Sequence, residues 1–168
     1  MRRRALSVIV ALLVAVPAFG KVAVGQAGPS FTLKDVRDST FSTARPRTRP
    51  LVLLFGTKDL ADFSLAWGDS IRAHMRGSVI VQPVLDLGDV SRLLRPVARQ
   101  RISAKRSRAV LDWDGHVSEA WRGTDRSQMV AIGVSPNNVA CFIVTGQATA
   151  ANVRQATQAI QAMSGGAR

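Results

Sequence analysis

Two stretches of sequence decide the fold: V-G-Q-A-G-P-S-F-T-L-K-D at residues 24–35 and L-V-L-L-F-G-T-K-D-L-A-D at residues 51–62. The first leads into an alternation of apolar and polar residues, at 31–33 and again at 40–42. Such alternation on both sides of a turn predicts a small β-hairpin. The second stretch opens with five consecutive apolar residues, which is typical of a strand buried on both faces of a sheet.

The rest of the chain alternates helical and extended patterns. Apolar residues at helical spacing predict helices, and short continuous apolar runs between turn residues predict strands. Strands that alternate with helices and close on an antiparallel pair predict an α/β fold, with a mixed sheet covered on both faces. The predicted helices span residues 59–75, 89–102 and 148–163, with one or two helical turns at 117–121; the predicted strands span 79–85, 129–134 and 139–144, with a short strand and turn at 109–115.

Both opening stretches resemble the redoxin branch of the thioredoxin-fold families. In those proteins a phrase of the form V-G-x-x-A-P-x-F-x-L-x-D opens the domain, and a strand that ends in a W-C-x-x-C loop follows. Here Gly28 stands for the usual Ala. Residues 109–121, A-V-L-D-W-D-G-H-V-S-E-A-W, look like the redoxin segment L-x-D-x-D-G-x-x-x-x-x-Y/W. The resemblance covers residues 24–163 and implies a thioredoxin-like mixed β-sheet flanked by helices on both faces, with an N-terminal β-hairpin.

The chemistry that this resemblance would imply is missing from the loop that should carry it. Asp59 and Asp62 occupy the two cysteine positions, and a carboxylate cannot act as the attacking or resolving thiol. Thr57 matches a peroxiredoxin loop residue, but no cysteine lies three residues further on. Met129 stands where the family places a cis-proline. We therefore predict a degenerate active-site loop, formed by these four residues, with no catalytic residue in it.

Short groups of acidic residues in this sequence have two interpretations. Asp59 is a natural N-cap for the predicted helix, and an acid in the first helical turn interacts well with the helix dipole. Alternatively, Asp59 and Asp62 hold a cation, although two carboxylates alone make a poor site. Asp112, Asp114 and His116 alternate in a way that could chelate a metal, but turn formation explains them more simply. We predict no metal and no cofactor.

Cys141 is the single cysteine of the chain. One cysteine cannot form an internal disulfide or run a two-cysteine redox cycle within one chain. Its place in the apolar run V-A-C-F-I-V predicts a buried side chain in the middle of a strand. The alternative is a thiol-based antioxidant, or an enzyme related to the disulfide oxidoreductases, that uses Cys141 through an intermolecular disulfide.

The first twenty residues have the pattern of a secretory signal peptide. Arg2–Arg4 form a basic start, the apolar run that follows is too short to span a bilayer, and Ala18 and Gly20 are the small residues that a signal peptidase reads. Cleavage after Gly20 leaves residues 21–168 as one domain, located in the periplasm or secreted. Cleavage after Ala27 and retention as a membrane anchor are the alternatives.

The chain is strongly basic. Its formal net charge is +12, and loss of Arg2–Arg4 leaves +9. This charge favours an acidic protein or peptide partner, or an anionic envelope surface. Nucleic acid is a poor candidate, because an aromatic content of 5% with no tyrosine offers little surface for base stacking. The alternative is compositional bias. The predicted anion-binding residues lie in a loop and are Arg101, Lys105, Arg106 and Arg108, with a second group of cations in the connector 44–50.

Three hypotheses for function follow from these observations. The first is an exported, redox-inactive binding or accessory module, whose vacated groove between the Asp59 loop and Met129 takes a peptide or protein. The second is the thiol enzyme that uses Cys141. The third is a structural envelope protein that retains the fold without a ligand. The aspartates at both thiol positions favour the first hypothesis over the second.

Overall fold

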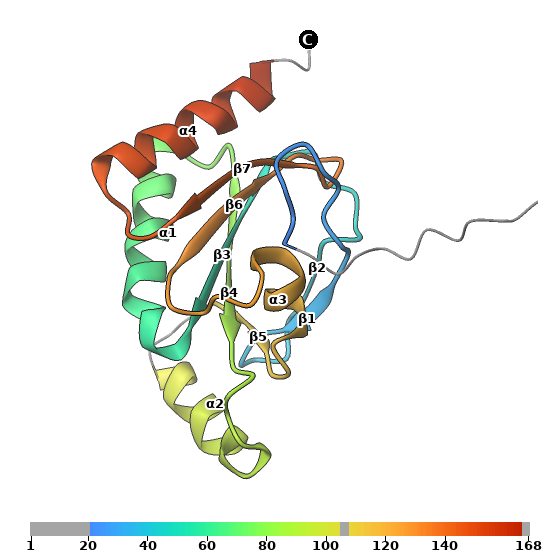
Figure 1. The fold of residues 1–168 in the computed structure, drawn as a ribbon, viewed down its shortest axis with the longest axis vertical. Coiled ribbons are helices and arrows are strands. Elements are labelled where there is room, and N and C mark those ends of the chain that lie inside the picture. Colours follow the sequence, from blue (N-terminus) through green and yellow to red (C-terminus); the bar gives the residue numbers. More distant parts are fainter. Residues whose placement is uncertain (1–20, 105–107, 166–168) are drawn as a thin grey trace, which may run out of the picture.

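The computed structural model describes residues 21–104 and 108–165, and Figure 1 shows a central sheet with helices on both of its faces. The predicted signal peptide lies outside the described residues, as do Lys105 and Arg106. The elements in chain order are β1 (Thr32–Lys34), β2 (Thr40–Ser42), β3 (Leu51–Thr57), the 3-10 turn η1 (Lys58–Leu60), α1 (Ala61–Met75), β4 (Ile80–Asp86), the 3-10 turn η2 (Arg92–Leu94), α2 (Arg95–Ala104), β5 (Val110–Asp112), α3 (His116–Arg122), β6 (Val130–Val134), β7 (Ala140–Thr145) and α4 (Ala150–Gly165).

The main sheet has five strands in the order β5-β4-β3-β6-β7. β3 runs parallel to β4 and antiparallel to β6, so the sheet is mixed. β1 and β2 form a separate antiparallel hairpin in which Leu33 lies opposite Phe41. Six of the seven residues of β3 are buried, as expected of its continuous apolar run in the middle of the sheet. The predicted α/β class, the mixed sheet and the N-terminal hairpin are confirmed.

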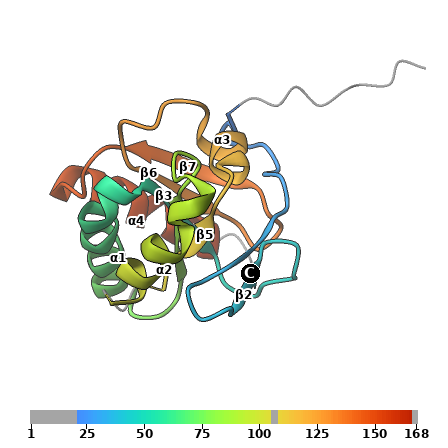
Figure 2. The same ribbon diagram turned by 90° about the horizontal axis from the view of Figure 1, so that it is seen from below.

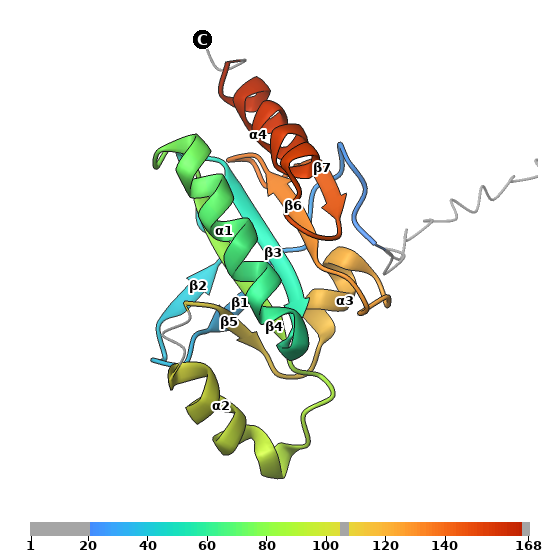
Figure 3. The ribbon, with the colours of Figure 1, turned by 90° about the vertical axis from the view of Figure 1, so that its left-hand side faces the viewer.

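Two apolar layers cover the sheet. On one face, α1 and α4 pack side chains such as Trp67, Ile71 and Ile160 against β3, β6 and β7. On the other face, α3 and the β1–β2 hairpin contribute Trp121 and Phe31. Figures 1 and 3 show α1 and α4 on one side of the sheet and α3 on the other. β3 supplies residues to both layers, because its side chains alternate between the two faces.

Gly28, the departure from the redoxin opening phrase, is explained by Trp121. The Trp121 ring is fully buried, stacked on Phe55 with 6.1 Å between the ring centroids and edge-on to Phe31 at 6.2 Å. Its Nε1 donates a hydrogen bond to the carbonyl oxygen of Pro29 at 3.1 Å. A Cβ atom on residue 28 would overlap the far atoms of the indole ring. The opening phrase therefore carries Gly where the ring needs its space.

Two predicted helices begin differently in the structure. The helix expected from residue 59 starts at Ala61, after the separate 3-10 turn η1. The helix expected over residues 89–102 is divided into η2 and α2, and α2 continues to Ala104. Pro96 lies in the first turn of α2, where its missing N–H has no intrahelical partner to lose. The proline thus marks the beginning of a helix rather than a kink within one.

Candidate functional site

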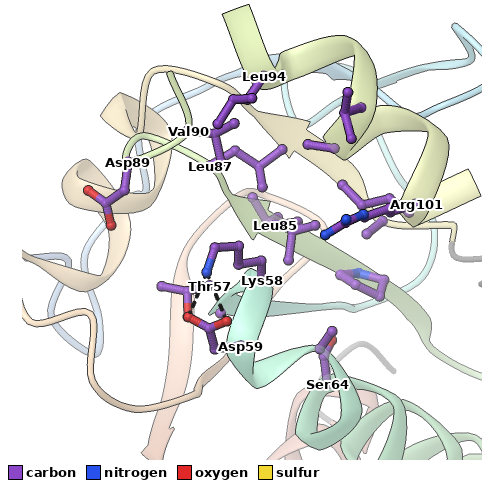
Figure 4. Close-up of a pocket in the computed structure, with 18 of the residues that line it drawn as sticks. Thr57, Lys58, Asp59, Ser64, Leu85, Leu87, Asp89, Val90, Leu94 and Arg101 are labelled. Atoms are coloured by element: carbon purple, nitrogen blue, oxygen red, sulfur yellow. Dashed lines mark hydrogen bonds and ion pairs between the residues drawn. The ribbon is translucent and has the colours of Figure 1, made fainter. Parts of the chain in front are cut away.

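A groove with a volume of ≈ 690 Å³ lies between α1 and α2. Its floor includes Pro83 and Leu85 of β4, and its head lies at the loop that follows β3. Figure 2, which views the molecule from below Figure 1, shows α1 and α2 beside one another. Figure 4 shows the side chains that line the space between them. The volume is within the range of small-molecule and cofactor pockets.

The walls of this groove are apolar and open to water. Leu65 of α1 is 48% exposed, and on the opposite wall Leu94 and Val97 are 58% and 48% exposed. Leu93, one residue outside the lining, is 88% exposed. Side chains of this kind are normally buried, and a cluster of exposed ones marks a binding surface. The groove is therefore the candidate functional site.

None of the residues of α2 is fully buried, and the helix is held by polar contacts and by the partly buried Ile102, which packs on the core cluster that contains Leu85 and Leu87. Arg95 donates to the carbonyl oxygen of Trp113 at 2.9 Å and to Asp114 at 2.7 Å, and its guanidinium lies 5.5 Å from the centroid of the Trp113 ring. Arg99 donates to the carbonyl oxygen of Val36 and to Asp38. Hydrogen bonds from these arginines lower the pKa of both carboxyl groups. Neither arginine lines the groove, so the apolar side of α2 remains available.

The charged residues of the groove differ in whether they are already paired. Asp59 accepts hydrogen bonds from Lys58 Nζ at 2.9 and 3.0 Å, and Asp89 is paired with Arg126. Arg101 of α2 makes no ion pair with any other residue in the described ranges. Figure 4 shows its side chain extending from α2 toward Leu85 and Lys58. Among the described residues, Arg101 is thus a cation of the groove lining without an ion-pair partner, and it lies beside an apolar floor.

The predicted degenerate loop is only partly brought together. Thr57 and Asp59 line the head of the groove. Asp62 is exposed on the first turn of α1 and does not line the groove. It is not a free carboxylate, because it interacts with another group. Met129 is 2% exposed and packs against Gly56, where a Cβ atom would overlap its sulfur. The groove next to Asp59 is thus bounded by α2, and Met129 lies beneath the loop as part of the core.

The predicted role of Asp59 as a helix N-cap is wrong. The residue before α1 is Leu60, and within the described part of the chain no side chain caps either η1 or α1. Asp59 lies inside the 3-10 turn, and its carboxylate is paired with Lys58. The early turn shifts the start of the helix past Asp59, so the carboxylate no longer faces the free N–H groups that an N-cap satisfies.

The predicted anion-binding residues do not form one loop. Arg101 belongs to α2, and Arg108 is exposed just before β5. In the connector, Arg47 donates to the carbonyl oxygens of Thr43 and Ser135, and Arg49 donates to that of Gly77. These two connector arginines therefore hold the backbone in place. Of the predicted cations that the structure describes, Arg101 lines the groove.

A buried ionic cluster at the end of β4 was not predicted from the sequence. Asp86, whose side chain is 2% exposed, is paired with the fully buried Arg122 at 2.7 Å and with Arg126 at 2.6 Å. Asp86 also accepts a hydrogen bond from the backbone N–H of Gly88 at 3.0 Å. Because Arg126 also contacts Asp89, the cluster fixes the loop that forms one end of the groove.

Asp112, Asp114 and His116 do not converge on a common point. Asp112 is buried and accepts a hydrogen bond from the backbone N–H of Ser118 at 2.7 Å, and burial raises its pKa. Asp114 is paired with Arg95, and His116 is exposed at the start of α3. Within residues 21–104 and 108–165, no three His, Cys, Asp or Glu side chains gather as a possible metal site.

Cys141 lies on the edge strand β7 and is half-buried. Its Sγ donates to the carbonyl oxygen of Val139 at 3.3 Å. Burial raises the pKa of the thiol, which reduces the fraction of reactive thiolate at neutral pH. Cys141 does not line the groove.

Comparison with known proteins identifies the fold through structure alone. No protein-family model and no curated protein sequence matches the chain. A Chlorobium tepidum protein described as the thiol:disulfide interchange protein DsbE matches with a TM-score of 0.64 and 13% identity, over 85% of this chain and 99% of the other. The exposed lipoprotein thioredoxin of Streptococcus pneumoniae strain TIGR4 matches with a TM-score of 0.62 and 14% identity, over 77% and 98%. The peroxidoxin BcpB of Mycobacterium tuberculosis matches with a TM-score of 0.58 and 13% identity, over 84% and 97%.

The fold is therefore thioredoxin-like, and its structural relatives include redoxin proteins, as the sequence resemblance implied. The relatives match along nearly their whole length, so the resemblance concerns the complete domain. At such low sequence identity, the structural similarity establishes the fold but not the activity. Among the helices in the described ranges, none has the length and apolar character needed to cross a bilayer.

Proposed function

We propose that this chain is an exported, redox-inactive binding module that holds an apolar part of a partner protein in the groove between α1 and α2. One observation carries the proposal: the open apolar groove begins at the loop where Asp59 and Asp62 replace the two thiols. The structural relatives of this fold include thiol oxidoreductases. In this chain, the place of their two reactive cysteines is next to an apolar binding surface.

The remaining cysteine gives little support to the alternative of a thiol enzyme. A reactive thiol needs a lowered pKa and access to its substrate. Burial raises the pKa of Cys141, and the residue lies on β7, away from the groove lining. Both features favour a structural role for this side chain.

Export and a preference for acidic partners are parts of the same proposal. The pattern of residues 1–20 supports export, and one structural relative is described as an exposed lipoprotein. The net charge of the chain without Arg2–Arg4 supports an acidic protein partner, with an anionic envelope surface as the other candidate.

The absence of thiol chemistry is tested by activity. The mature protein should neither reduce insulin disulfides nor consume peroxide above background, because no thiol pair lies at the start of α1. Both assays are run beside a Cys141→Ser variant, which should behave identically. Turnover that disappears in Cys141→Ser would contradict the proposal and favour the thiol enzyme.

The groove itself is tested with an apolar fluorescent dye, anilinonaphthalene sulfonate. The folded protein should enhance the fluorescence of the dye, and Val97→Gln should remove most of the enhancement, since Val97 lines one wall. Phe63→Gln is the matched control, because Phe63 is an exposed apolar residue of α1 outside the groove lining. Equal losses from the two substitutions would show that the dye reports general surface hydrophobicity and not this groove.

A further inference from the structure

The shape of the groove restricts what can occupy it. Its apolar walls, Leu65 on one side and Leu94 and Val97 on the other, are all about half exposed. An occupant therefore touches apolar surface below and water above. A purely apolar chain would leave its outer side in contact with water, whereas an amphipathic segment satisfies both environments.

The backbone of the groove excludes an added strand. The strand at its floor, β4, is paired with β3 along its whole length and with β5 at Val84–Asp86. Pro83, the floor residue before this pairing, has no N–H to donate to an added strand. Within the described residues, the floor of the groove therefore offers no free strand edge, and a peptide lying there would not continue the sheet. The side of an occupant that faces the apolar floor finds no backbone partner there, and a helix is the form that satisfies its backbone hydrogen bonds internally on every side.

The charge of the groove selects the polar residues of that helix. The two acids in its lining, Asp59 and Asp89, are already paired with Lys58 and Arg126, while Arg101 has no such partner among the described residues. α2 carries arginines and no acid. A second copy of this basic chain would bring cations against cations, and the leader has Arg2–Arg4 and no acid. An acidic partner is complementary.

From these three restrictions we infer that the groove binds an acidic amphipathic helix of a partner protein, with its apolar stripe between Leu65 and Val97 and an acidic side chain at Arg101. This inference rests on the proposed function, since it names the occupant of the same groove. In this binding mode, apolar side chains of the helix at i, i+3, i+4 and i+7 fill the groove, and charge sets the preference for acidic over basic helices.

The test uses the mature protein and two synthetic helical peptides. The peptides share one leucine stripe at i, i+3, i+4 and i+7 and differ only in their polar positions, which are Glu in one and Lys in the other. Fluorescence anisotropy should show several-fold tighter binding of the Glu peptide at physiological salt. Val97→Gln should weaken both peptides, because it removes a shared apolar contact.

Reversal of the charge at Arg101 tests whether this residue causes the preference for the Glu peptide. Arg101→Glu should weaken the Glu peptide by roughly tenfold and strengthen the Lys peptide, since one attractive contact becomes repulsive. Arg154→Glu makes the same change of net charge at an exposed position on α4, outside the groove lining. It should leave the ratio of the two affinities nearly unchanged, because salt screens distant charges beyond about 8 Å. Arg101→Ser, a milder change, covers the case in which Arg101→Glu does not fold.

Several outcomes would overturn the inference. Equal affinity for the two peptides, or an equal effect of Arg101→Glu and Arg154→Glu, would show that the groove does not select charge. If neither peptide bound while the dye still bound in a Val97-dependent manner, the proposed function would be retained. The inference that the occupant is a helix would be wrong. Retention on phosphatidylglycerol vesicles that depends on Arg101, without peptide binding, would assign this face to an anionic lipid surface instead.

Discussion

Arg122→Met should lower the free energy of unfolding by about 3–5 kcal/mol, because it leaves Asp86 as a buried carboxylate with one of its partners removed. Both side chains are almost completely buried and lie 2.7 Å apart. Arg126 still contacts Asp86 in the variant, so the lower end of that range is expected. Denaturant unfolding of the unsubstituted protein and of Arg122→Met measures the difference, provided that the unfolding free energy of both falls with denaturant concentration at the same slope.

The control for this prediction is an exposed ion pair. Arg72→Met removes the partner of Asp69 on α1, where the two side chains are 52% and 78% exposed, and it should cost no more than about 1 kcal/mol. The double variant Asp86→Asn/Arg122→Met should recover part of the loss, since no buried charge is then left unpaired. If Arg122→Met cost no more than Arg72→Met, the buried cluster would contribute nothing to the stability of the groove's loop.

Gly28→Ala should lower the free energy of unfolding by about 1–3 kcal/mol, the usual cost of forcing extra volume into a packed core. The added methyl group would overlap atoms Cη2, Cζ2 and Cζ3 of Trp121. Those three atoms belong to the six-membered ring at the far end of the indole, which a smaller side chain does not reach. Thermal or denaturant unfolding of the variant measures the cost.

A double-mutant cycle separates this overlap from other effects. Trp121→Phe alone loses apolar contacts and the hydrogen bond to Pro29, but it also vacates the space that the new methyl group needs. The combined variant should therefore be more stable than the sum of the two single effects predicts. Simple additivity would show that Gly28 is not required by the ring.

Much of the fold was predictable because its signals are local. The continuous apolar run at the start of β3 and the helical spacing in α1 and α4 are short-range patterns, and the structure confirms these elements to within a few residues. The start of α1 was misplaced because an acid before an apolar stretch indicates an N-cap, whereas the turn that precedes it is not visible in the pattern. Boundaries depend on such neighbouring turns.

The site was less predictable because it depends on contacts between distant residues. Asp86 and Arg122 lie 36 residues apart in sequence, so nothing in their local spacing indicates that they pair. The apolar spacing of residues 90, 93, 94 and 97 predicts a helix packed on the core, yet Leu93 is 88% exposed. Periodicity identifies an apolar face but does not tell whether the protein itself or another molecule covers it.

The attachment of α2 has a consequence for the thermodynamics of binding. A helix with no fully buried residue, held to the body through two arginines and the partly buried Ile102, contributes few apolar contacts to the cooperative core. Segments of this kind open locally at a small fraction of the global unfolding free energy. We therefore expect this wall of the groove to open more readily than the core, and an occupant that packs against it to stabilise the closed form. Amide hydrogen exchange across α2, with and without an occupant, reports how much of the interaction energy goes into suppressing this local opening.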